Sequence, residues 1–157
     1  MVMPPTDRIA AGFLSRVPMA QTLGLRIDDA SPTRATVTLP DQAPFHNHIG
    51  GPHAGAMFTL AETASGVIVF VAFGAQLGRA TPLAVRAEVD YRKLAMGDLV
   101  ASAHLDQDPA DIIVALDAGD RPEFDVKVDV RRGGGAVVAE VLICWTLRLN
   151  EAAATAQ

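Results

Sequence analysis

In the first fifty residues, the spacing of hydrophobic positions is first that of a helix and then that of strands. Apolar side chains recur at helical intervals over residues 7–17 and stop before a proline, which predicts a short N-terminal helix. Residues 23–29 and 33–39 have the pattern of two strands joined by a turn. The prolines and paired glycines of residues 40–52 predict a loop. The chain is therefore expected to begin with a helix and a hairpin.

Residues 53–73 are apolar on every side, which predicts a helix buried all round rather than an amphipathic one. A membrane span is the alternative, because the segment approaches the roughly 20 residues that cross a bilayer. The segment contains Glu62 and several hydroxyl side chains, however, and no second segment of this kind follows. We therefore expect a buried core helix and no membrane association.

In the second half of the chain, apolar and polar side chains alternate with the period of strands. Four strands are predicted there: residues 83–91, 99–106, 124–131 and 136–149. The first of them is expected to carry one apolar face, formed by Leu83, Val85, Ala87, Val89 and Tyr91. Three glycines at 133–135 predict the last hairpin turn, and residues 108–120 fit either a short helix or an irregular segment. The tail, residues 150–157, is expected to fray.

A helix that is apolar all round needs a sheet curled around it, because a flat sheet covers only one side. The order of elements therefore predicts an α+β fold: a curved antiparallel sheet of about six strands around one long central helix, with a short helix at the N-terminus. A length of 157 residues without a repeat or linker indicates one domain over residues 1–157.

Such a sheet has open edges, which proteins often cover by pairing with another chain. The last predicted strand, residues 136–149, is apolar on both faces, which indicates further burial between subunits. We expect a homodimer at least. A homotetramer, built as a dimer of dimers, agrees with the same pattern.

Composition and charge narrow the classes of function. The net charge is −5 and the basic residues form no cluster, so nucleic-acid binding has no electrostatic basis. The single cysteine, Cys144, rules out an intrachain disulfide and a cysteine-based metal cluster, and no metal site is expected. Residues 1–8 lack the pattern of a signal peptide, so a cytoplasmic location is expected.

Glu62 is the only charged side chain between Asp41 and Arg79 if histidines are neutral. Burying an unpaired carboxylate is costly, and the usual outcome is a raised pKa or a functional cavity. The helix that carries Glu62 follows a Gly-Gly-Pro loop, so its first backbone amides are free to hold an oxyanion. A carboxylate and such amides together suit acyl transfer to water.

The spacing of these two groups points to a second chain. Nine residues separate His53 from Glu62, or roughly 13 Å along a helix. The amides and the carboxylate of one chain are therefore too far apart to act on one carbonyl. Two antiparallel helices in a dimer bring the amides of one chain to the acid of the other, which makes dimerisation part of the expected mechanism.

The start of the long helix reads Asn47-His48-Ile49-Gly50-Gly51-Pro52-His53-Ala54-Gly55-Ala56 and continues as Thr59-Leu60-Ala61-Glu62-Thr63-Ala64. This pattern resembles the hotdog-fold thioesterases of the PaaI-like family, in which an Asn is followed six residues later by His-Gly-Gly and then by Leu-Ala-Asp or Leu-Ala-Glu. Both spacings match. Further likeness at residues 97–100 and 137–140 extends the resemblance to roughly residues 20–149, the expected core of the domain.

The resemblance implies hydrolysis of an acyl-CoA thioester to the free acid and coenzyme A, without a cofactor other than the coenzyme A of the substrate. Glu62 matches the acid that activates water or attacks the carbonyl itself. The amide of Gly55, or of Ala54 beside it, would polarise the thioester carbonyl. Asn47 would orient water or the acyl group, and His53 would shape the start of the helix or simply cap it.

Two positions depart from the family pattern. Ala54 stands where the family has a first Gly, and Gly66 stands where some relatives carry a Thr or Ser that assists the reaction. The hydroxyl of Thr63 or Ser65 is a partial replacement.

Basic residues after the third strand contact coenzyme A phosphates in relatives, although they also suit solvated strand ends. The residues expected to contact substrate or coenzyme A are Arg92, Lys93, Thr63 and Gly66.

Two other functions remain open at this point. Some hotdog proteins hydrate or dehydrate 3-hydroxyacyl and enoyl thioesters with a His and an acid, roles that His53 and Glu62 could fill. A third function is acyl-CoA binding without turnover. The Asn-to-His spacing and the Leu-Ala-Glu context favour hydrolysis.

Overall fold

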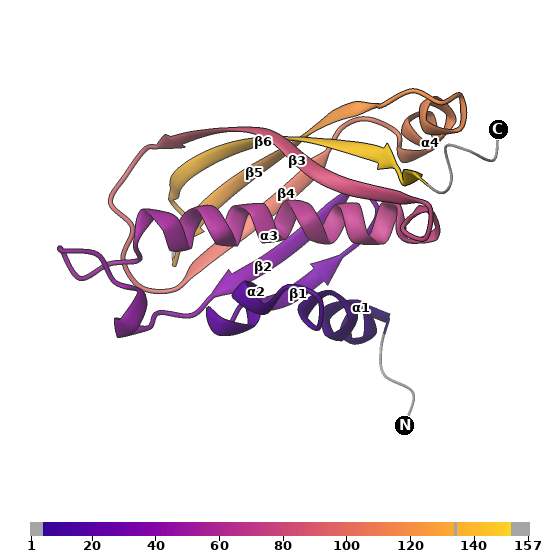
Figure 1. Cartoon of the computed structure of the whole chain (residues 1–157). Coiled ribbons are helices and arrows are strands. Elements are labelled where there is room, and N and C mark those ends of the chain that lie inside the picture. Colours follow the sequence, from indigo (N-terminus) through magenta and orange to yellow (C-terminus); the bar gives the residue numbers. More distant parts are fainter. Residues whose placement is uncertain (1–4, 134, 152–157) are drawn as a thin grey trace.

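Helix α3 (Ala54–Ala72) lies at the centre of the molecule, and the sheet curls around it (Figure 1). The computed structural model describes residues 5–133 and 135–151. Leu60, Ala61 and Ala64 are fully buried, because the sheet and the N-terminal helices cover the apolar surface of α3. The predicted helix is confirmed and is one residue shorter at each end. Its length and hydropathy would suit a bilayer, but here it is a core helix.

The six strands form one antiparallel sheet in the order β1-β2-β4-β5-β6-β3. Side chains on the concave face of β2, β4 and β5 contact α3. The strands are β1 (Arg26–Ala30), β2 (Arg34–Leu39), β3 (Ala80–Tyr91), β4 (Leu99–Leu105), β5 (Glu123–Arg132) and β6 (Val137–Leu149). The predicted α+β architecture, a curved sheet around one central helix, is confirmed, and it is the hotdog arrangement.

The N-terminal region contains two helices where the sequence predicts one. Helix α1 spans Pro5–Leu14, and α2 spans Pro18–Thr22. The predicted helix is wrong beyond Leu14, because Pro18 begins a second helix, a position where its missing amide hydrogen costs nothing. A turn through Gly24, whose φ is +64°, delays the first strand until Arg26. Helix α1 packs against β1 and α3 (Figure 1).

The ambiguous segment after β4 is a helix, α4 (Pro109–Asp117). Its start is defined by Asp108, whose carboxylate accepts a hydrogen bond from the amide of Ala110. Ile112 and Leu116 are buried on its inner face. The helical alternative of the sequence prediction is therefore the correct one.

Strand β3 lies at one edge of the sheet and contains a β-bulge between Ala84 and Arg86. The extra residue reverses which face of the sheet the odd-numbered side chains of β3 occupy. Leu83 pairs with Thr146, whose side chain lies on the face away from α3, whereas Ala87 pairs with Ile143, whose side chain lies on the face toward α3. The prediction of one continuous apolar face is therefore wrong at Leu83.

The remaining segments are short. Two 3₁₀ turns, Ala43–Phe45 and Gly74–Gln76, lie in the loop before α3 and in the turn after it. Residue 134 and residues 152–157 lie outside the described residues, and so do the predicted centre of the last hairpin turn and most of the predicted frayed tail.

Candidate active site

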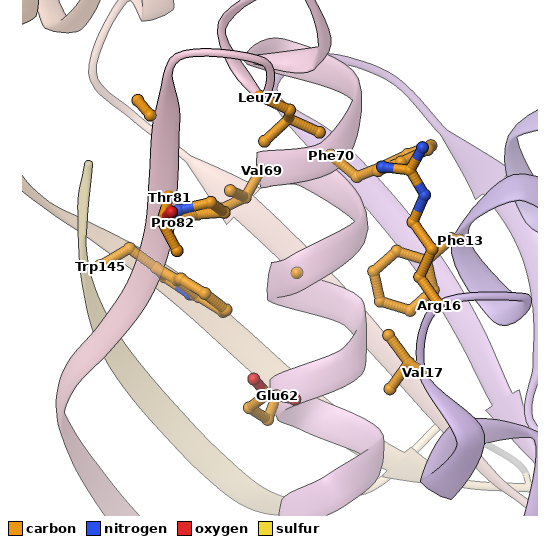
Figure 2. A pocket seen from close by; sticks show the side chains of 12 residues that line it. Phe13, Arg16, Val17, Glu62, Val69, Phe70, Leu77, Thr81, Pro82 and Trp145 are labelled. Carbon is orange, nitrogen blue, oxygen red and sulfur yellow. The ribbon is translucent and has the colours of Figure 1, made fainter. Parts of the chain in front are cut away.

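Glu62 lies near the middle of α3 with its side chain half-buried (Figure 2). Its carboxylate makes no hydrogen bond and no ion pair with any residue that the structure describes. Burial raises the pKa of Glu62 above its ordinary value of 4.5, because the ionised form loses solvation and gains no partner. The sequence prediction of a solitary acid in an apolar environment is thus reproduced by the geometry.

The side chain of Glu62 opens into a pocket of about 380 Å³ between α1, α3 and the β3–β6 edge of the sheet. On α3 the pocket follows one stripe of the helix, Glu62, Gly66, Val69 and Phe70, the spacing of a single helical face. The opposite walls are mostly apolar and comprise Phe13, Arg16, Val17, Leu77, Ala80, Thr81, Pro82 and Trp145. A mostly apolar pocket with one desolvated carboxylate is a common form of an active site.

A chain of two hydrogen bonds fixes one wall of this pocket. The indole Nε1 of Trp145 donates to the hydroxyl of Ser65 at 3.0 Å, and that hydroxyl donates to the backbone carbonyl of Glu62 at 2.7 Å. Trp145 is therefore held against the turn of α3 that carries the acid. The Ser65 hydroxyl already has two partners, and its residue is fully buried.

Gly66 forms the floor of the pocket one turn after Glu62. A Cβ atom placed there would lie 3.4 Å from the ring of Phe13 and 3.8 Å from Trp145, which is ordinary contact. The position thus has room for a methyl group and leaves that room to the pocket. Thr63 is fully buried, its hydroxyl has no hydrogen-bond partner among the described residues, and it does not line the pocket.

The N-terminus of α3 lies in a second hollow, separate from the Glu62 pocket. His53 caps the helix, and its Nδ1 accepts a hydrogen bond of 2.9 Å from the amide of Gly55. The amide of Ala56 has no acceptor among the described residues, as expected in a first helical turn. His53 and Gly55 line this second hollow with Met19. Within one chain, the predicted oxyanion donors and the acid therefore do not share a pocket.

Asn47 organises the loop that leads into α3. Its side-chain oxygen accepts hydrogen bonds from the amides of Ile49 and Gly51, at 3.0 and 3.2 Å, and its amide nitrogen donates to the carbonyl of Pro52. Gly51 is buried, and a Cβ there would lie 2.3 Å from the carbonyl oxygen of Ala95. Asn47 thus sets the position of the helix start.

The two basic residues predicted to contact coenzyme A have different environments. Arg92 donates to Glu140 at 2.7 Å and lies 3.6 Å from Asp90, so its charge is balanced within the chain. Lys93 is exposed and forms no ion pair with any described residue. Among the described residues, no group of three His, Cys, Asp or Glu side chains could hold a metal ion.

Sequence reasoning did not identify the residues that face Glu62 across the pocket. Phe13 lies on α1, and Arg16 and Val17 lie in the turn after it, but nothing in the sequence links this segment to α3. Trp145 is the only tryptophan in the chain, and its alternation with neighbours predicts an inward side chain without indicating what it meets. Only the packing of α1 and β6 against α3 reveals these walls.

Solved structures of similar proteins share this architecture. A protein of unknown function from Pseudomonas aeruginosa, PA5026, described as a probable thioesterase, is 27% identical, with a TM-score of 0.82 over 94% of this chain and 97% of its own. A mutant form of the P. aeruginosa thioesterase PA1618 is 14% identical with a TM-score of 0.74 over 95% and 97%. A thioesterase family protein from Silicibacter pomeroyi is 20% identical with a TM-score of 0.72 over 92% and 99%.

The last two likenesses concern the fold alone, and no curated protein matches the sequence. The model of one protein family, described as a domain of unknown function (DUF4442), matches residues 6–147, nearly the whole chain. The expected resemblance to hotdog-fold thioesterases is confirmed by these comparisons. The chain belongs to the DUF4442 family and has the hotdog fold of the thioesterases that it resembles.

Proposed function

We propose that this protein hydrolyses an acyl-CoA thioester to the free acid and coenzyme A. The observation that carries the proposal is the unpaired, desolvated carboxylate of Glu62 in an apolar pocket. The 27% identity to a protein described as a probable thioesterase supports the same reaction class. The acyl-CoA substrate, the cytoplasmic location and the absence of a further cofactor are parts of this proposal.

Glu62 acts in one of two ways. As a general base, its carboxylate takes a proton from water while the water oxygen bonds to the thioester carbonyl carbon. The carbonyl π electrons move onto oxygen, and collapse of the tetrahedral intermediate breaks the C–S bond and releases the thiolate, which takes up the proton. As a nucleophile, the carboxylate attacks the same carbon, expels the thiolate and leaves an anhydride that water then cleaves.

Backbone amides at the start of α3 donate hydrogen bonds to the oxyanion that forms at the thioester carbonyl. The amide of Gly55 is occupied by the ring of His53 in this structure, so that ring turns away when the amide receives an oxyanion. Ala54 lies beside Gly55 in the same first turn. Because these amides and Glu62 of one chain lie in separate pockets, the amides come from a second subunit.

The second subunit binds along β3 in this proposal. Strand β3 is an edge strand of 12 residues, and Leu83, Val85 and Tyr91 on it are 36%, 44% and 51% exposed. The other edge strand, β1, has 5 residues and is mainly charged. A long apolar edge favours pairing with an identical edge. A homodimer follows, and a dimer of dimers agrees with it.

Replacing Val85 by Lys is expected to turn the dimer into a monomer and to abolish turnover, because a charge at the edge opposes strand pairing. Light scattering after gel filtration measures the mass, which should fall from twice the chain mass of 16.5 kDa to that mass itself. Val114→Lys is the matched control, since Val114 is 67% exposed on α4. A wild-type protein that is monomeric and fully active would contradict the proposal.

A panel of acyl-CoA thioesters tests the reaction class. Thiol release is followed together with the absorbance of enoyl thioesters and with equilibrium binding. Thiol release that depends on Glu62 supports hydrolysis. A change in enoyl absorbance without thiol release identifies a hydratase, and saturable binding without any product identifies a binding protein. The 27% identity to a protein described as a probable thioesterase favours hydrolysis over hydration.

A further inference from the structure

Arg16, an exposed residue in the turn after α1, is the only charged residue other than Glu62 among the described residues that line the pocket. Its guanidinium lies over the ring of Phe70, 5.4 Å from the ring centroid. Its side chain makes no ion pair or hydrogen bond with any residue in the described part of the chain. One face of the guanidinium therefore lies against an aromatic ring, while its N–H groups remain free to form a bidentate pair of hydrogen bonds with an anion.

The two charges lie at opposite ends of the pocket. In Figure 2, Glu62 lies at the lower end of the visible helix, and the guanidinium of Arg16 lies beside Phe70 at the upper end. Eight residues separate Glu62 from Phe70, which is about 12 Å along the helix axis. Burial alone raises the pKa of Glu62, and Arg16 does not lower it, in agreement with this separation.

The pocket lining between the two charges is mostly apolar. It consists of Gly66 and Val69 on α3, with Phe13 and Trp145 on the flanks. Such a surface fits a hydrocarbon segment that connects a reacting carbonyl to a negatively charged group. In an acidic protein with a net charge of −5, an unpaired arginine at this place is the local positive charge that an anionic substrate needs.

We propose that Arg16 binds an anionic group of the substrate at one end of the pocket while the thioester carbonyl lies at Glu62 at the other end. This assignment rests on the proposed hydrolysis and names the substrate class: a thioester with a carboxylate or phosphate far from the carbonyl. A terminal carboxylate would end an acyl chain of roughly eight to ten carbon atoms, because C–C bonds of about 1.5 Å advance an extended chain by roughly 1.3 Å each over that distance. A phosphate would belong to coenzyme A, whose pantetheine arm is longer than this distance and contains two polar amides, so the apolar surface favours the terminal carboxylate.

Four substrates separate these two sources. They are the coenzyme A and the N-acetylcysteamine thioesters of decanoic acid, and the corresponding monothioesters of decanedioic acid. The cysteamine thioesters carry no phosphate, and only the decanedioic thioesters carry a terminal carboxylate. The variant is Arg16→Ala, and the control is Arg8→Ala, which removes the same charge from an exposed position on α1 that does not line the pocket.

Arg16→Ala is expected to raise KM about 10-fold for substrates with the recognised anion and to leave kcat unchanged, because Arg16 does not reach the reacting atoms. A rise confined to the decanedioic thioesters identifies the terminal carboxylate. A rise confined to the coenzyme A thioesters identifies the phosphate. Equal changes for all four substrates, or changes no larger than those of Arg8→Ala, would overturn the proposal.

A binding measurement keeps this test independent of hydrolysis. Trp145 is the only tryptophan and lines the pocket, so its fluorescence reports occupancy. Binding of the four intact thioesters is measured in Glu62→Gln, with and without Arg16→Ala. If the wild-type protein hydrolyses none of them, the proposed function fails. The assignment of Arg16 then stands if its removal weakens binding only of the thioesters that carry the recognised anion, and fails if it does not.

Discussion

Glu62→Gln is expected to lower the rate of acyl-CoA hydrolysis at least about 100-fold, the range for loss of an acid–base group. Glutamine keeps the volume and the hydrogen-bonding capacity of the side chain but can neither accept a proton from water at neutral pH nor attack a carbonyl. The protein should remain folded, because the substitution removes a half-buried charge that has no partner among the described residues. Thiol release at saturating and at limiting substrate measures the effect on kcat and on kcat/KM.

Asp120→Asn is the matched control for this substitution. Asp120 is exposed after the end of α4, and its side chain forms no ion pair or hydrogen bond within the described residues, so its removal changes the net charge by the same amount without touching the pocket or β3. Glu62→Ala is a second variant, which removes the volume of the side chain as well as its carboxylate. A folded Glu62→Gln protein that turns over substrate at the wild-type rate would remove Glu62 from the mechanism.

Gly51→Ala is expected to destabilise the protein by at least about 2 kcal/mol, in the upper part of the range for overpacking. Its Cβ would lie 2.3 Å from the carbonyl oxygen of Ala95 and 2.8 Å from the sulfur of Met96. A backbone carbonyl cannot move aside as a flexible side chain does. The loop that Asn47 organises must shift, and the start of α3 shifts with it. Denaturant unfolding measures the loss.

Two other glycines provide graded controls. Gly50 has a φ of +80° but open space around it, so Gly50→Ala should cost about 1 kcal/mol through backbone strain alone. Gly74 is exposed, with open space and no positive φ, so Gly74→Ala should stay within about 0.5 kcal/mol. A loss of stability for Gly51→Ala no larger than that for Gly50→Ala would show that the contact with Ala95 is not tight.

The sequence predicts the centre of this fold well because one segment has an unusual composition. Residues 53–73 are apolar on every side, and only a wrapped sheet covers such a helix. The same contrast makes Glu62 visible as a solitary charge. These predictions need no knowledge of which elements pack together, since they follow from the cost of exposing apolar surface and of burying charge.

The walls of the pocket could not be predicted, because they depend on long-range packing. Arg16 lies in the exposed turn after α1 and lines the pocket only because α1 packs against α3, and Trp145 lies 83 residues after Glu62. The hydrogen bond from the Gly55 amide to the His53 ring could not be predicted either, because it depends on the side-chain torsions of His53. The β-bulge at Val85 likewise reverses an alternation that looks continuous in the sequence.

The protonation of Glu62 tests the account most directly. The side-chain carboxyl carbons of the five glutamates are followed by ¹³C NMR against pH, and the Glu62 signal is the one that Glu62→Gln removes. Because burial raises its pKa, Glu62 should protonate at a pH clearly above 4.5, and kcat/KM should fall as the pH falls through the same value. Titration of Glu62 at or below 4.5 would mean that its carboxylate is solvated or paired with a cation, and would contradict the account.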